Sequence, residues 1–230
     1  MRSAILFILI SYNVFGQIFP IGFISNQEGG TATVYDDTYT TIGTQKWLDH
    51  DFDITTYNDG TAILYVANAA EWASANTSGT GAWCYAEYDL NTNIKLYNYY
   101  AINNTSNGGL IPNGWHLPTQ AEYETMISFI GGGGTNQALK LMSPDFISVS
   151  TGEPIGSAAT NEFGFNALRT KYMKNSGTIS GFQSNWWTAT VQTSDAYYFK
   201  TETSNGESYK LNVSKTLAFG SGLAIRLLKD

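Results

Sequence analysis

The sequence has one cysteine and few charged residues, and each shortage excludes a class of function. Cys84 is the only cysteine among 230 residues, so no disulfide can form within the chain and no CxxC metal or redox pair is present. Charged side chains make up only 13% of the chain, its net charge is −7, and no basic cluster occurs. Cations are needed to neutralise phosphates or anionic lipids, so we expect neither nucleic acid nor a membrane surface as a partner.

Residues typical of common enzymes are also scarce. A Ser–His–Asp triad would have to use His50 or His116, and no Gly-x-Ser-x-Gly turn is present. For His116, in the turn that precedes Pro118, we expect a hydrogen-bonded structural role. Glycoside hydrolysis by two carboxylates stays open, because a sequence does not reveal which carboxylates meet. We expect a protein that is not an enzyme and that holds no cofactor.

Length and composition predict a single domain with an N-terminal extension. Hydrophobic residues make up 43% of the chain and aromatic residues 14%, enough to build one large core. The apolar run at residues 4–10 is far shorter than the roughly 20 residues that span a bilayer. Residues 1–16 therefore indicate a secretory signal peptide, with an uncleaved N-terminal apolar segment as the alternative. We interpret residues 17–38 as a linker or docking arm and residues 39–230 as the domain.

The clearest local signal is a helix over residues 119–130. Thr119 and Glu122 form a capping box, in which each side chain bonds to the backbone of the other residue. Apolar residues then recur at helical spacing until a run of four glycines, which ends the helix. Residues 54–65 have the pattern of a hairpin, and the small residues at 67–81 indicate a surface excursion.

Seven motifs in order resemble one protein family. They are IGTQKW (42–47), TTYNDG (55–60), GAWCY (81–85), KLYNYYA (95–101), GWHLPTQAEY (114–123), TNEFGFNAL (160–168) and WWTAT (186–190). Together they resemble the Fibrobacter succinogenes major paralogous domain family, common in exported proteins of Bacteroidetes. The helix start also looks like that of the formylglycine-generating enzyme group. The resemblance implies an α+β, C-type-lectin-like fold with irregular antiparallel sheets and long loops.

The chain departs from these relatives where their chemistry lies. Formylglycine-generating relatives use a pair of cysteines and iron-dependent relatives use three histidines, whereas this chain has one cysteine and two histidines. Leu227 stands where family members commonly have a late cysteine. We therefore expect Cys84 to be a small buried apolar residue.

One acidic segment also differs from the family pattern. Asp49, His50, Asp51 and Asp53 form the densest group of metal-capable side chains, and three carboxylates in five residues are compatible with calcium. We favour a solvated loop instead, because no twelve-residue calcium loop is present. Alternation would place the three carboxylates on one wet face.

The C-terminal third has the composition of a binding surface. Tyrosine beside Ser, Asn and Gly is typical of adaptable recognition surfaces. We assign Trp186 and Trp187 to the core and expect Tyr198, Tyr209 and Lys210 to be exposed on one contiguous face. The predicted ligand-binding residues are Tyr198, Lys200, Glu202, Asn205, Glu207, Tyr209 and Lys210.

Two functions fit this reading. The first is an exported or surface-displayed recognition module that binds a glycan or protein on a cell surface, as an adhesin or a phage receptor-binding protein does. The alternative is a structural component of a surface assembly or virion, docked through residues 17–38 as a homo-oligomer or to a partner. Both place the protein outside the cell, at a cell surface or on a virion surface.

Overall fold

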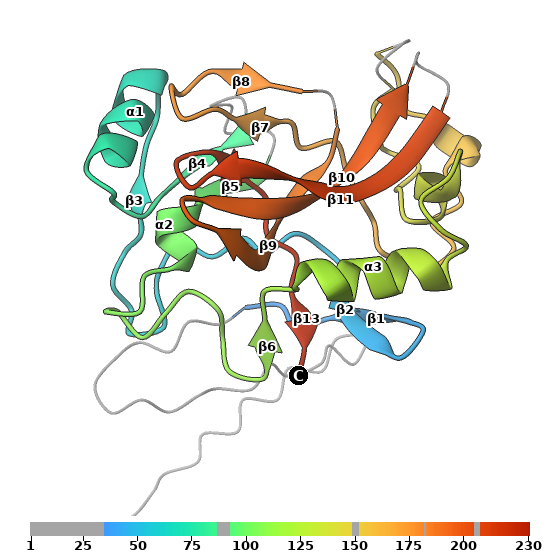
Figure 1. Ribbon diagram of the computed structural model, residues 1–230, viewed down its shortest axis with the longest axis horizontal. Coiled ribbons are helices and arrows are strands. Elements are labelled where there is room, and N and C mark those ends of the chain that lie inside the picture. Colours follow the sequence, from blue (N-terminus) through green and yellow to red (C-terminus); the bar gives the residue numbers. More distant parts are fainter. Residues whose placement is uncertain (1–34, 87–92, 149–151, 182, 205–207) are drawn as a thin grey trace, which may run out of the picture.

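The protein is a mixed α+β structure in which most elements are strands (Figure 1). The computed structural model describes residues 35–86, 93–148, 152–181, 183–204 and 208–230. Residues 1–34, with the expected signal peptide and most of the docking arm, lie outside this part. Among the described residues, no helix is both long and apolar enough to cross a membrane.

A four-stranded sheet joins the two ends of the domain. Its order is β1-β2-β13-β6, and all of its pairs are antiparallel. Leu228 in β13 pairs with Trp47 in β2 and with His116 in β6, so the last strand lies between two early ones. The strands are β1 (Tyr39–Ile42), β2 (Gln45–Leu48), β6 (Trp115–His116) and β13 (Leu228–Lys229).

A six-stranded sheet of short strands has the order β3-β4-β5-β12-β7-β8. Its β3–β4 pair is parallel and its other pairs are antiparallel, which modifies the expected all-antiparallel arrangement. Residues 54–65 form only one bridge, Thr56 to Ala62, before the chain enters β3. The strands are β3 (Leu64–Tyr65), β4 (Ala82–Tyr85), β5 (Lys95–Asn98), β7 (Tyr172–Met173), β8 (Ile179–Ser180) and β12 (Gly222–Leu223).

The third sheet contains the longest strands, and its central part is buried on both faces. Its order is β11-β10-β9, formed by β9 (Asn185–Gln192), β10 (Asp195–Ser204) and β11 (Ser208–Ala218). Phe199 packs into one apolar cluster with Trp186, whereas the adjacent Tyr198 packs into a second cluster with Trp187. The prediction that both tryptophans are core residues is confirmed.

Stacked rings hold the first cluster together. The ring of Phe199 stacks on Tyr123 at 4.4 Å and on Trp186 at 5.4 Å between centroids. Cys84 is a free cysteine that is fully buried in the same cluster, as predicted, and burial raises the pKa of its thiol. Leu227 is buried in the second cluster.

One helix was predicted from the sequence and another was not. Helix α3 (Gln120–Phe129) has the predicted capping box, with the Thr119 backbone N–H 2.7 Å from a Glu122 carboxylate oxygen. Residues 67–81 are not an irregular excursion, because they contain helix α1 (Ala69–Thr77). Asn68 caps α1 by accepting from the backbone N–H groups of Ala70 and Glu71. A short helix α2 (Tyr99–Ile102) follows β5.

The prediction that Tyr198 and Tyr209 are exposed on one face of the β10–β11 hairpin is wrong. Tyr198 and Tyr209 are only 8% and 7% exposed, and Lys200 is also buried. The two tyrosines are buried in two different apolar clusters. Lys210 is half-buried. The side chain of Glu202, and residues Asn205 and Glu207, lie outside what the structure describes.

Replacing Tyr209 with alanine tests this correction. Its ring meets Phe146 edge-on at 6.3 Å, so Tyr209→Ala removes a buried aromatic contact and leaves a cavity. We expect the free energy of unfolding to fall by about 3 kcal/mol, measured by urea denaturation. Val191→Ala, at a residue that is 51% exposed, is the control and should change it by less than about 0.5 kcal/mol. Equal effects of the two substitutions would contradict the burial of Tyr209.

Candidate functional site

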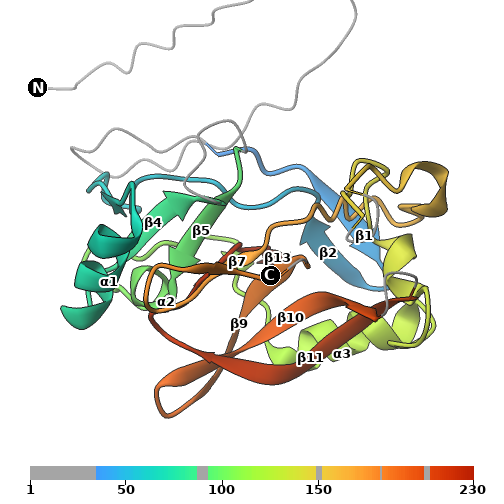
Figure 2. The ribbon, with the colours of Figure 1, turned by 90° about the horizontal axis from the view of Figure 1, so that it is seen from above.

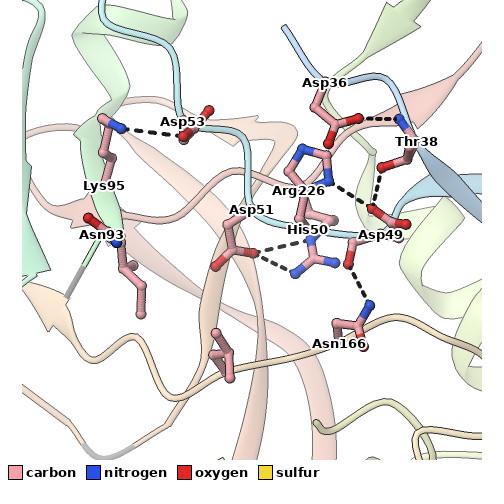
Figure 3. A pocket seen from close by; sticks show the side chains of 12 residues that line it. Asp36, Thr38, Asp49, His50, Asp51, Asp53, Asn93, Lys95, Asn166 and Arg226 are labelled. Atoms are coloured by element: carbon pink, nitrogen blue, oxygen red, sulfur yellow. Dashed lines mark hydrogen bonds and ion pairs between the residues drawn. The ribbon is translucent and has the colours of Figure 1, made fainter. Parts of the chain in front are cut away.

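An open pocket of about 430 Å³ lies where four segments meet around one arginine (Figure 3). The segments are residues 36–38, residues 49–53, the start of β5 and residues 166–168. In Figure 2 the chain between β2 and β3 runs along the side of the molecule opposite the β10–β11 hairpin. The lining residues are Asp36, Thr38, Asp49, His50, Asp51, Asp53, Asn93, Ile94, Lys95, Asn166, Leu168 and Arg226.

A buried ion pair forms the floor of this pocket. The side chain of Arg226 is 1% exposed, and its Nε and Nη2 lie 3.1 and 2.6 Å from one carboxylate oxygen of Asp51. The indole N–H of Trp186 donates to the same oxygen at 2.7 Å. A charge this deeply buried is stable only when it is paired and hydrogen-bonded, and both conditions are met here.

The same arginine ties together three distant parts of the chain. Its Nη1 donates to the backbone carbonyls of Leu48, at 3.1 Å, and of Phe165. The guanidinium carbon lies 4.3 Å from the ring centroid of Phe165, within cation–π range. Arg226 therefore fixes the pocket floor to the end of β2 and to residues 165–168.

The acidic segment runs alongside the C-terminal residues. Backbone bonds from Leu48 to Leu227 and from Phe52 to Ile225, each 2.9 Å long, hold it there. Asp49, Asp51 and Asp53 all line the pocket, as the alternation predicts for one face. That face is not uniformly wet, however. The side chain of Asp51 is only 13% exposed, because it is paired with Arg226.

The other two carboxylates of the segment have weaker partners. Asp49 accepts from the Thr38 hydroxyl at 2.9 Å and contacts His50 Nδ1 at 2.7 Å. Asp53, whose side chain is 64% exposed, lies 3.5 Å from the Lys95 ammonium at the mouth of the pocket.

The opposite wall is a loop held by paired asparagines. Asn166 accepts from the side chain of Asn161 at 2.6 Å and donates to the backbone carbonyl of Asp49 at 3.1 Å. Asn166 has a φ of +52°, a left-handed conformation that asparagine tolerates better than most residues. This loop is part of the TNEFGFNAL motif, so residues that carry the family resemblance also build the wall.

The pocket favours hydrogen-bond donors over anions. Four carboxylates line it, against the cations Lys95 and Arg226. An ionised carboxylate only accepts hydrogen bonds, so a ligand must offer hydroxyl or N–H groups. Arg226 is already bound to Asp51 and to two carbonyls, and adds little attraction for an anion.

Of the two histidines considered for catalysis, His50 lines the pocket, whereas His116 lies elsewhere and holds the C-terminus. His116 Nδ1 is 2.6 Å from Asp230 and its Nε2 is 3.0 Å from Glu122. Burial alone would lower the pKa of His116, but its bonds to the two carboxylates outweigh burial and raise the pKa. The protonated ring can donate to both carboxylates at once, which links β6, α3 and the last residue.

Sequence reasoning identified the acidic segment but missed its partner. Arg226 lies 175 residues from Asp51, a separation that no local spacing rule covers. A signal was nevertheless present, because Arg226 is the one charged residue in the apolar stretch 222–228. Such a residue in a buried closing segment requires a carboxylate partner, and Asp49, Asp51 and Asp53 were the densest group of candidates.

No calcium dependence is expected from this geometry. In the part of the chain that the structure describes, no three His, Cys, Asp or Glu side chains gather closely enough to hold a metal ion. Asp51 is paired with Arg226, so the central carboxylate of the three considered for calcium already has a partner. We predict equal melting temperatures in millimolar calcium and in EDTA. Because a ligand that binds only the folded state raises its stability, a rise of several degrees in calcium would contradict this prediction.

Comparisons with known proteins return one match. The family model described as Fibrobacter succinogenes major domain matches residues 40–229. No curated protein and no solved structure matches the chain.

Proposed function

We propose that this chain, which belongs to the Fibrobacter succinogenes major domain family, is an exported recognition module. It binds a glycan or a protein at a cell surface, as an adhesin or a phage receptor-binding protein does. Its binding site is the pocket between residues 49–53 and 166–168, in place of the β10–β11 hairpin.

One observation carries this proposal: the polar lining surrounds a floor that is already fixed before any ligand arrives. Asp51 accepts three hydrogen bonds, from two nitrogens of Arg226 and from Trp186. Binding sites are typically preformed concave surfaces with a few precisely placed polar groups, since a rigid site loses little entropy on binding. The pocket has this character, with amide, hydroxyl and carboxylate groups around its opening.

The pairing of the carboxylates favours binding over catalysis. Asp49, Asp51 and Asp53 each have a partner within the pocket, which holds them in place. We therefore propose a domain that is not an enzyme and that needs no cofactor.

The fold, the roles of the N-terminal segments and the location are further parts of the same proposal. We infer a C-type-lectin-like fold for residues 39–230, supported by the irregular sheets, the long loops and the pairing of β2 with the final strand β13. We also infer that residues 1–16 are a signal peptide and residues 17–38 a linker. The protein would then act outside the cell, on a cell or virion surface.

A substitution that fills the pocket with a larger side chain tests the proposed function. Leu168 lines the pocket with a side chain that is 36% exposed, so Leu168→Trp should block the opening without disturbing the core. Val191→Trp adds the same bulk at an exposed residue outside the pocket lining. Each labelled protein is applied to a printed glycan array and to a displayed library of random peptides, with melting temperatures as the folding check.

We expect wild type and Val191→Trp to bind the same glycans or peptides and Leu168→Trp to lose at least tenfold in affinity. If Leu168→Trp binds as wild type does, the pocket is not the site. If wild type binds neither collection, the recognition function itself is contradicted.

A further inference from the structure

Three aromatic residues form a rim beside the pocket. Tyr65 in β3 packs on Trp83 in β4 at 4.8 Å between ring centroids, and Trp83 meets Tyr85 at 5.2 Å. Tyr65 also meets Tyr85 edge-on at 6.0 Å. We call Tyr65, Trp83 and Tyr85 the aromatic rim. Because each ring contacts the other two, the rim is a rigid surface.

Lys95 connects this rim to the pocket. Its ammonium lies 5.6 Å from the centroid of Trp83 and 5.7 Å from that of Tyr85, and it also pairs with Asp53. Lys95 lies directly across from Tyr85 in the β4–β5 ladder and lines the pocket. The rim and the pocket mouth are therefore parts of one continuous surface.

The outer part of the rim is open to solvent. Tyr65 is 41% exposed and its neighbour Leu64 is 46% exposed, on the strand that forms one edge of the six-stranded sheet. The indole N–H of Trp83 is buried and has no hydrogen-bond partner among the described residues. An exposed aromatic ring beside carboxylates presents an apolar face and polar acceptors to the same ligand.

We propose that this surface binds a neutral saccharide, with a sugar ring stacked on Tyr65 and hydroxyl groups donating to the pocket carboxylates. The proposal rests on the proposed function, because it names the ligand of the same site. A saccharide combines an apolar C–H face, which packs on an aromatic ring, with hydroxyl donors, which carboxylates accept.

Charge argues against the other saccharide classes. An acidic sugar would meet four carboxylates that outnumber the two lining cations, both of which already have carboxylate partners. The carboxylates would attract an amino sugar, but its ammonium, when the sugar is stacked on the rim, would also meet the ammonium of Lys95, which already lies over Trp83 and Tyr85. A neutral ligand avoids both repulsions.

Calorimetric titration with defined hexasaccharides tests this proposal. The neutral probes are cellohexaose, xylohexaose, mannohexaose and N-acetylated chitohexaose, and the charged probes are hexagalacturonate and hexaglucosamine. Tyr65→Ala removes the stacking ring. Tyr39→Ala is the matched control, because Tyr39 has a similar exposure, 44%, on a different sheet.

We expect at least one neutral hexasaccharide to bind and its affinity to fall roughly 2- to 10-fold in Tyr65→Ala, the size of an aromatic contact. Tyr39→Ala should bind as wild type does, and Tyr65→Phe should keep most of the affinity. The melting temperature of Tyr65→Ala shows whether any loss of affinity reflects unfolding.

Three outcomes would overturn the proposal: no neutral probe binds, only a charged probe binds, or Tyr65→Ala and Tyr39→Ala weaken binding equally. If a peptide or a charged sugar instead binds in a way that Leu168→Trp blocks, the recognition function stands and the saccharide assignment fails. The recognition function and the saccharide assignment can therefore be refuted separately.

Discussion

The bond between Arg226 and Asp51 holds together the part of the molecule that we propose as the recognition site. A guanidinium and a carboxylate in this position would each be costly to bury alone, and their pairing removes most of that cost. Arg226 comes from the last strand region, Asp51 from the segment after β2, and the ring beneath them from Phe165. Because three remote segments meet at one guanidinium, the shape of the pocket depends on that contact more than on any local turn.

This arrangement also relates the proposed binding site to the fold. The C-terminal segment supplies Arg226 to the pocket and then enters β13, which lies between β2 and β6. His116 and Glu122 bind the final residue, Asp230, so the chain end is fixed a few residues beyond the pocket. The pocket floor and the four-stranded sheet thus share the same C-terminal segment. Loosening the C-terminus should disturb the pocket before it disturbs the β10–β11 sheet.

Local chemistry could be predicted from the sequence, whereas long-range pairing could not. The capping box at Thr119 specified where α3 begins, and the ordered motifs specified the family. Helix α1 was missed because its residues are small, although the cap Asn68 with Glu71 was present. The β10–β11 hairpin was misjudged because tyrosine and lysine resemble surface residues until a second layer, here Phe146 over Tyr209, covers them. The acidic segment was found, but its function depends on an arginine 175 residues away.

A double-mutant cycle on Asp51 and Arg226 tests the central claim most directly. Asp51→Asn, Arg226→Met and the double variant are compared with wild type by urea denaturation. Each single change leaves a buried group without its charged partner, so we expect each to lower the free energy of unfolding by about 3 kcal/mol. The double variant should lose clearly less than the sum, with a coupling of about 2 kcal/mol. Additive losses, within about 0.5 kcal/mol, would show that the two residues act independently and would contradict the account.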